Sequence, residues 1–182
     1  MEVLVVGDSW ASAVEGDTKK DAGWPDILGV DPEYQQGVGG TTAYQWSHDH
    51  NGMLTKARET ECDTLIVSLM GNDARAALSD GKVTHDEVLT ALGSMRNVLN
   101  WLCRKRTFVI LYADPFSGKN TQSRAGIPIL NAAIRFVVQG DAHFIDLGEI
   151  LDERHFDGKD IHPTRAGHEV IAEHFRRILG DE

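Results

Sequence analysis

The feature that most constrains the fold is an alternation of short apolar runs with longer segments of helical periodicity. The apolar runs are rich in β-branched residues and cover residues 3–6, 64–69, 108–112 and 144–147, with a weaker run near 33–36. Strands that alternate with helices in this way form a mainly parallel sheet covered on both faces. The pattern therefore predicts one doubly wound α/β domain over residues 1–182, with a five-stranded sheet.

Helical periodicity is clearest in a segment over 85–103, where Thr84 and Glu87 form a capping box at the start. A second helix is expected over 126–138 with Pro128 in its first turn, and the last one follows Thr164 and ends at Gly180. The stretch over 42–58 also has helical character, although Gly52 weakens its continuity.

Charge and hydropathy narrow the possible partners. The formal net charge is -10, from 28 acidic and 18 basic residues, which disfavours nucleic acid and anionic membranes because both attract basic surfaces. No apolar run approaches the roughly 20 residues that span a bilayer, so we expect a soluble protein without membrane insertion. The sequence carries no signal for the oligomeric state.

The start of the chain and its cysteines bear on location. The first strand begins almost at Met1, which leaves no room for a signal peptide. Cys62 and Cys103 lack Cys-x-x-Cys spacing and are expected to be reduced, partly buried thiols. We therefore expect a cytoplasmic or otherwise soluble location.

Short polar and glycine-rich blocks follow three of the predicted strands. They read Gly-Asp-Ser at 7–9, Gly-Val-Gly-Gly-Thr-Thr at 37–42 and Gly-Asn-Asp at 71–73. Parallel strands present their carboxyl ends at one edge of a sheet, so Ser9, Gly40 and Asn72 are expected on one rim. A serine nucleophile needs a base, and His162 is the best candidate because an acid flanks it and Pro-Thr follows it at the start of the last helix.

The order and spacing of these four blocks resemble the SGNH hydrolases, the GDSL-type esterases and lipases. The resemblance spans nearly the whole chain and implies a flavodoxin-like SGNH fold. It further implies that Ser9 is the nucleophile and His162 the general base. The implied oxyanion hole consists of the backbone amides of Ser9 and Gly40 and the side-chain amide of Asn72. No cofactor and no metal are expected.

Two departures from the family pattern stand out. The third block has Met70 where the family usually has a glycine, two positions before Asn72. The triad acid usually lies three residues before the histidine, and here that position is Lys159, which has no acceptor for an imidazole. Asp160 is favoured as the acid because residues two apart in an extended segment face the same way. Asp157 is the alternative, because Asp157-Gly158 matches the family's Asp-Gly pair with two residues inserted.

Other side chains near the blocks have expected supporting roles. Asp8 and Asp73 are expected to accept hydrogen bonds from nearby backbone amides and so to fix the turns. Trp10 and Phe116 are expected to border the acyl or leaving-group pocket.

The sequence thus predicts a serine esterase that hydrolyses esters of small or medium acyl groups through an acyl-enzyme. The expected substrate is a small-molecule or carbohydrate ester, with carbohydrate O-acetyl groups among the candidates. One alternative is a catalytically silent SGNH-fold binding module, which Lys159 in the usual place of the acid suggests. The other alternative is an acyltransferase or thioesterase.

Overall fold

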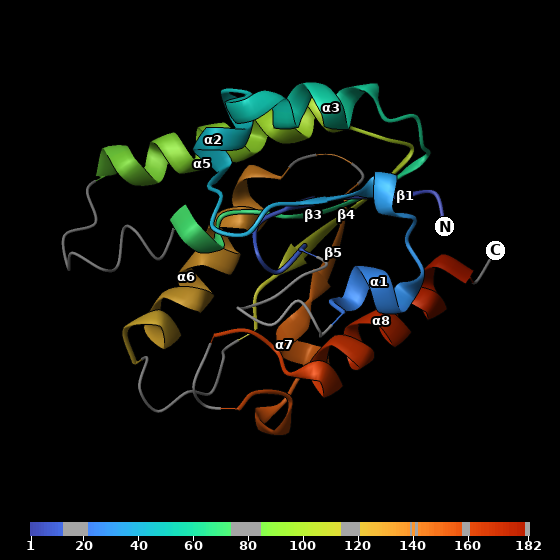
Figure 1. Ribbon diagram of the computed structural model, residues 1–182. Helices are drawn as coiled ribbons and strands as arrows, with labels where there is room; N and C mark the ends of the chain where they lie inside the picture. Colours follow the sequence, from blue (N-terminus) through green and yellow to red (C-terminus); the bar gives the residue numbers. More distant parts are fainter. Residues whose placement is uncertain are drawn as a thin grey trace.

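A five-stranded sheet runs through the centre of the protein, and every strand pair in it is parallel (Figure 1). The computed structural model describes residues 1–12, 22–73, 85–113, 121–138, 140, 142–157 and 161–180. In sheet order the strands are β2 (Gln35–Gly37), β1 (Val3–Gly7), β3 (Thr64–Ser68), β4 (Arg106–Leu111) and β5 (His143–Asp146). The predicted doubly wound parallel sheet is confirmed.

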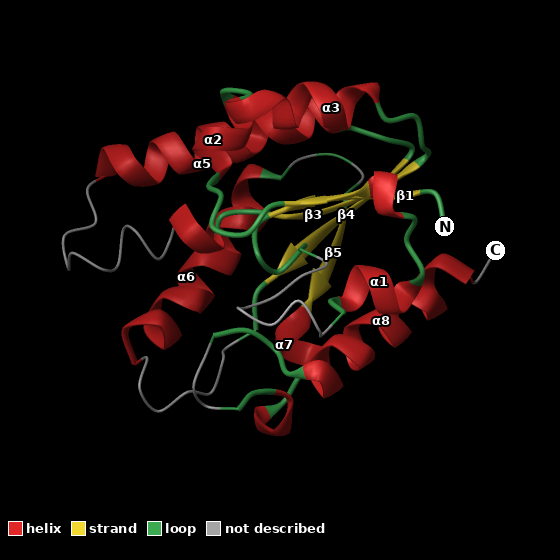
Figure 2. Cartoon of the chain, in the orientation of Figure 1, coloured by secondary structure: helices red, strands yellow, loops and turns green. Residues whose placement is uncertain are grey.

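Helices cover both faces of this sheet (Figures 1 and 2). One face carries α1 (Trp24–Leu28), α7 (Leu147–Ile150) and α8 (Arg165–Gly180), and α8 contacts both of the others. The other face carries α2 (Ala43–Ser47), α3 (Met53–Glu59), α5 (His85–Leu102) and α6 (Thr121–Val137). Short 3-10 helices cover Pro32–Tyr34, His50–Gly52 and Glu153–His155.

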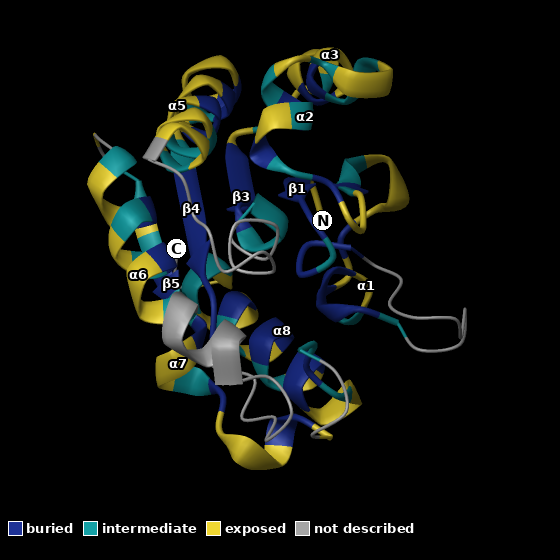
Figure 3. Cartoon of the chain, turned by 90° about the vertical axis from the view of Figure 1, so that its left-hand side faces the viewer, coloured by how far each residue is buried: buried dark blue, intermediate teal, exposed yellow. Residues whose placement is uncertain are grey.

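The core lies between the sheet and these two helical layers. Every residue of β1 and β3 is buried, as expected for central strands with both faces covered. Figure 3 shows the same arrangement, with buried strands inside and exposed outer helix faces. Trp24 of α1 stacks on Phe175 of α8 with ring centroids 4.8 Å apart, and this contact fastens the two helices together.

Two helix predictions need correction. The segment over 42–58 is not one helix, because Asp49, Asn51 and Gly52 all have positive φ and divide it into α2, a 3-10 turn and α3. Helix α6 begins at Thr121, so Pro128 lies inside it rather than in its first turn. Proline removes one backbone donor, and the buried face of α6 outweighs that loss. The last helix runs over Arg165–Gly180 as predicted, while Thr84 lies outside the described residues.

The structure also tests the expectations about membrane-spanning helices and cysteines. Within the described residues, no helix has both the length and the apolar character needed to cross a bilayer. Cys62 and Cys103 are both free thiols. Cys62 is partly buried as predicted, but Cys103 is exposed because it follows the last turn of α5 at the surface.

Candidate active site

The first functional pair joins the two ends of the chain. Ser9 lies in the turn directly after β1, and His162 lies shortly before α8. The Oγ atom of Ser9 is 2.7 Å from Nε2 of His162, which is hydrogen-bond distance. With a neutral imidazole protonated on Nδ1, the serine hydroxyl donates to Nε2, which is the arrangement a general base requires.

The glycine-rich block lies beside this pair. A Cβ atom added to Gly39 would stand 3.9 Å from the Cβ atom of Ser9, so the two backbones approach closely. Gly40 has a φ of 78°, a left-handed conformation that glycine adopts without strain. The side-chain amide of Asn72 donates to the carbonyl oxygen of Thr41 at 2.9 Å. Because that amide carries two hydrogens, the bond to Thr41 fixes its direction and leaves one hydrogen for another acceptor.

Helix α2 holds this block in place. Thr42 and Gln45 form a capping box, in which each side chain bonds the other residue's backbone amide. Asp73 accepts from the backbone amide of Ala43 at 2.8 Å, so the third block is tied to the start of α2. Burial raises the pKa of Asp73, and its backbone hydrogen bonds oppose that rise. The expected role of Asp73 is confirmed, with the amides coming from a neighbouring element.

The loop that carries His162 is closed at its base. The carbonyl oxygen of His155 accepts from the backbone amide of Thr164 at 2.8 Å and from its hydroxyl at 3.2 Å. The buried His155 ring is fixed in turn, because its Nδ1 atom accepts from the backbone amide of Asp152 at 2.9 Å. The two ends of the segment that carries His162 are therefore held together by the bonds between His155 and Thr164.

Both candidate acids lie between His155 and Thr164 in the sequence. Asp157 is an exposed residue at its start. Asp160, the favoured acid, lies outside the described residues, as does Lys159. The choice between Asp160 and Asp157 therefore stays a prediction.

Asp8 is an almost completely buried carboxyl group directly before Ser9. Its side chain is 1% exposed, and its Oδ1 atom accepts from the backbone amide of Trp10 at 3.0 Å, which confirms the expected turn contact. Its Oδ2 atom accepts from the hydroxyl of Tyr112 at 2.6 Å and from the backbone amide of Gly71 at 3.2 Å. Burial raises the pKa of Asp8 to about 6, against the lowering effect of these hydrogen bonds.

Tyr112 is a site residue that the sequence patterns did not single out. It follows β4 directly, at the same edge of the sheet as Ser9, and burial next to Asp8 raises its pKa well above the ordinary value. One feature of the sequence could have indicated this role. Tyr112 places a hydroxyl at the carboxyl end of a buried strand, as the blocks at 7–9, 37–42 and 71–73 also follow strands. The apolar character of the run over 108–112 concealed it.

Met70 occupies the position where the family usually has glycine. Its φ is 95°, a conformation that side chains other than glycine adopt rarely. Its side chain is buried, so packing compensates for the strained backbone. Gly71 has no room for a side chain, because an added Cβ atom would stand 2.9 Å from Oδ2 of Asp8.

The Trp10 ring packs beside Tyr112 and His162. Its ring is 5% exposed and lies edge-on to Tyr112 at 5.4 Å, with the His162 ring at 6.2 Å. Phe116, expected beside it at the acyl pocket, lies outside the described residues.

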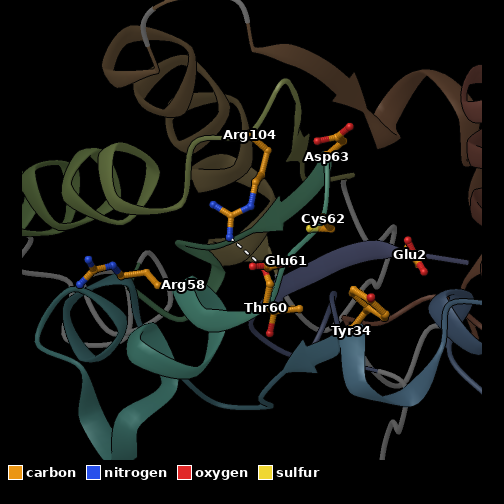
Figure 4. Close-up of a pocket in the computed structure, with 8 residues that line it drawn as sticks. All are labelled: Glu2, Tyr34, Arg58, Thr60, Glu61, Cys62, Asp63 and Arg104. Carbon is orange, nitrogen blue, oxygen red and sulfur yellow. Dashed lines mark hydrogen bonds between the residues drawn. The ribbon is translucent and has the colours of Figure 1, made fainter.

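A cavity of about 720 Å³ opens at the opposite edge of the sheet (Figure 4). Apart from Arg58 of α3, its lining residues lie in the segments before strands, and Arg104 donates to the carbonyl oxygens of Thr60 and Ala57, each at 3.2 Å. The Arg104 guanidinium therefore binds backbone carbonyls at the end of α3, and we assign it a structural role. Across the described ranges, no three His, Cys, Asp or Glu side chains are grouped to hold a metal ion.

Comparison with known proteins identifies the family. The sequence model of the GDSL-like Lipase/Acylhydrolase family matches residues 5–170. The chain belongs to this family. It is a GDSL-type serine hydrolase that acts on esters, and its sheet and helices have the SGNH architecture. A search of curated proteins finds no match.

Solved structures share the fold of this GDSL-type hydrolase at low sequence identity. Axe2, an acetylxylan esterase from Geobacillus stearothermophilus, is 15% identical with a TM-score of 0.72, covering 99% of this chain and 94% of its own. LAE5, an α/β hydrolase enzyme from the metagenome of Lake Arreo in Spain, is 16% identical with a TM-score of 0.72, covering 98% and 94%. Substitutions of a serine, an aspartate and a histidine in Axe2 are described as catalytic mutants, the aspartate three positions before the histidine.

Proposed function

We propose that this GDSL-type hydrolase cleaves carboxylic esters of small acyl groups through an acyl-enzyme on Ser9, with carbohydrate O-acetyl esters as its substrate class. The observation that carries the proposal is the 2.7 Å approach of Ser9 Oγ to Nε2 of His162 at the rim that also holds Gly40 and Asn72. Family membership supports the nucleophilic role of the serine.

The reaction follows from the positions of these atoms. Ser9 Oγ bonds the ester carbonyl carbon while its proton moves to Nε2 of His162. The carbonyl oxygen becomes an oxyanion that accepts from the amides of Ser9 and Gly40 and from the free hydrogen of Asn72. When the tetrahedral intermediate collapses, the alcohol leaves with the proton held by His162. Water then repeats the sequence, releases the acid and restores Ser9.

A carboxylate completes the triad in the proposal. Asp160 bonds Nδ1–H of His162, keeps the proton on that nitrogen and stabilises the imidazolium that forms. Asp157 is the alternative donor of this carboxylate. The catalytic aspartate of Axe2 stands three positions before its histidine, where this chain has Lys159, so the proposed acid comes from a shifted position.

Carbohydrate acetyl esters are favoured because the similar structure Axe2 is an acetylxylan esterase that covers nearly the whole chain. The experiment compares acetate release from acetylated xylo-oligosaccharides with hydrolysis of 4-nitrophenyl acetate, butyrate and octanoate. The proposal predicts the highest kcat/KM for acetyl esters and a fall with acyl length. Octanoate as the best substrate would contradict it.

The same assay separates hydrolysis from acyl transfer. Added methanol or free sugar should leave most of the acyl group as free acid, because water is the proposed acceptor. Preferential formation of a new ester would show an acyltransferase.

A further inference from the structure

A buried carboxylate beside the nucleophile has no part in the reaction described above. Asp8 is 1% exposed, and among the described residues no basic side chain pairs with it. A buried charge without a cationic partner destabilises a fold unless hydrogen bonds replace its hydration. The position of Asp8, one residue before Ser9, is therefore unusual for a group that only holds a turn.

Three donors surround the Asp8 carboxylate. Oδ1 accepts from Trp10 N–H at 3.0 Å, while Oδ2 accepts from Tyr112 O–H at 2.6 Å and Gly71 N–H at 3.2 Å. An ionised carboxylate only accepts, and each of these three bonds stabilises its charged form. The nearest group of like charge is Asp73 in the third block, which disfavours ionisation.

Tyr112 is itself rigidly held. The side chain of Asn131 in α6 accepts from the backbone amide of Tyr112 at 2.9 Å and donates to its carbonyl at 2.8 Å. The Tyr112 ring is 2% exposed and lies edge-on to Trp10. Its hydroxyl donates to Asp8 and also accepts from Gly71 N–H at 3.0 Å. The Gly71 amide is therefore shared between two oxygens.

The hydrogen-bonded group of Asp8, Tyr112 and Gly71 is one peptide bond away from the proposed nucleophile and one peptide bond away from the proposed oxyanion donor. Asp8 precedes Ser9, and Gly71 precedes Asn72, whose amide is the oxyanion donor in the proposed function. We propose that Tyr112 and Asp8 are positioning residues that hold the Gly71 amide and thereby set the distance between Ser9 and the Asn72 side chain. This inference rests on the proposed function, and it adds a residue that follows β4 to the blocks that follow β1, β2 and β3.

The test compares Tyr112→Phe with the wild type and with Tyr34→Phe as a matched control. Tyr34 lies at the opposite edge of the sheet, so its substitution removes the same atom far from the site. Tyr112→Phe should lower kcat by between about tenfold and a hundredfold with little change in KM, because misplacement of the donor affects the transition state most. The acid limb of its kcat profile should move to higher pH, since Asp8 loses a donor that favours its ionised form.

A second variant keeps the inference testable if Tyr112→Phe folds poorly. Asp8→Asn should lower kcat by a similar factor, and the double variant should be no slower than the slower single one, because both act through one unit. Wild-type kcat and an unshifted pH profile in folded Tyr112→Phe would overturn the inference while leaving the proposed function intact. A wild-type protein without ester hydrolysis would instead overturn the proposed function and this inference together.

Discussion

Oγ of Ser9 and Nε2 of His162 lie 2.7 Å apart although 153 positions separate them in the sequence. The serine follows the first strand and the histidine precedes the last helix, so the whole doubly wound fold is needed to join them. The pair also depends on the bonds from Thr164 to the His155 carbonyl, which close the histidine loop.

Asn72→Ala should lower kcat by about a hundredfold or more with a smaller change in KM. The side-chain amide is directed by Thr41 and is lost on truncation, and one oxyanion donor contributes a factor of this size. Steady-state kinetics on 4-nitrophenyl acetate measures the effect, with the exposed α5 residue Asn97 changed to Ala as the control. An increase in KM alone would assign Asn72 to substrate binding.

The triad acid is decided by two single substitutions and their combination. If Asp160 orients His162, Asp160→Asn should lower kcat by up to about ten-thousandfold, because the imidazole then takes the wrong tautomer. Asp157→Asn should then have a modest effect. The reverse order would identify Asp157. Losses below about tenfold in both, and in the double variant, would mean a Ser-His dyad.

The sequence predicted the sheet well because its signals are local. Fully buried strands read as apolar runs, and the blocks after β1, β2 and β3 read as glycine and polar residues. Ser9, Gly40 and Asn72 were expected at that rim on this basis, whereas His162 was chosen from its place before the last helix. The long helix at 42–58 failed because positive φ values at Asp49 and Asn51 leave no pattern in hydropathy.

Tyr112 and the bounds of α6 could not be predicted from local sequence patterns. The hydroxyl of Tyr112 matters through contacts to Asp8 and Gly71, which are distant in sequence, so no window of residues reveals it. Pro128 suggested a helix start, yet tertiary packing of the buried α6 face keeps the proline inside a longer helix. Both outcomes depend on neighbours that only the fold supplies.

Asp8 should make the protein less stable as the pH rises. Its pKa is raised from an ordinary 3.8 to about 6, so between these values the folded state binds more protons than the unfolded state. Stability from this group is present below pH 3.8 and is lost as the pH passes 6, by up to about 3 kcal/mol. Asp8→Asn removes this dependence.

The measurement is urea unfolding of the wild type and Asp8→Asn at about pH 4.5 and 5.5, within the titration range, and at about pH 7.5, above it. The unfolding free energy of Asp8→Asn relative to the wild type should increase steadily across the series. A constant difference at all three pH values would show that Asp8 has the same pKa in both states.

The central claim, that Ser9 is the nucleophile, is tested most directly by covalent labelling with a fluorophosphonate followed by peptide mass spectrometry. The account predicts one label per chain on the peptide that contains Ser9, with simultaneous loss of ester hydrolysis. Ser9→Ala should neither label nor turn over substrate, while Ser47→Ala, which changes a half-buried serine of α2, should behave as the wild type. Ester hydrolysis retained by folded Ser9→Ala, or a label on another residue, would contradict the account.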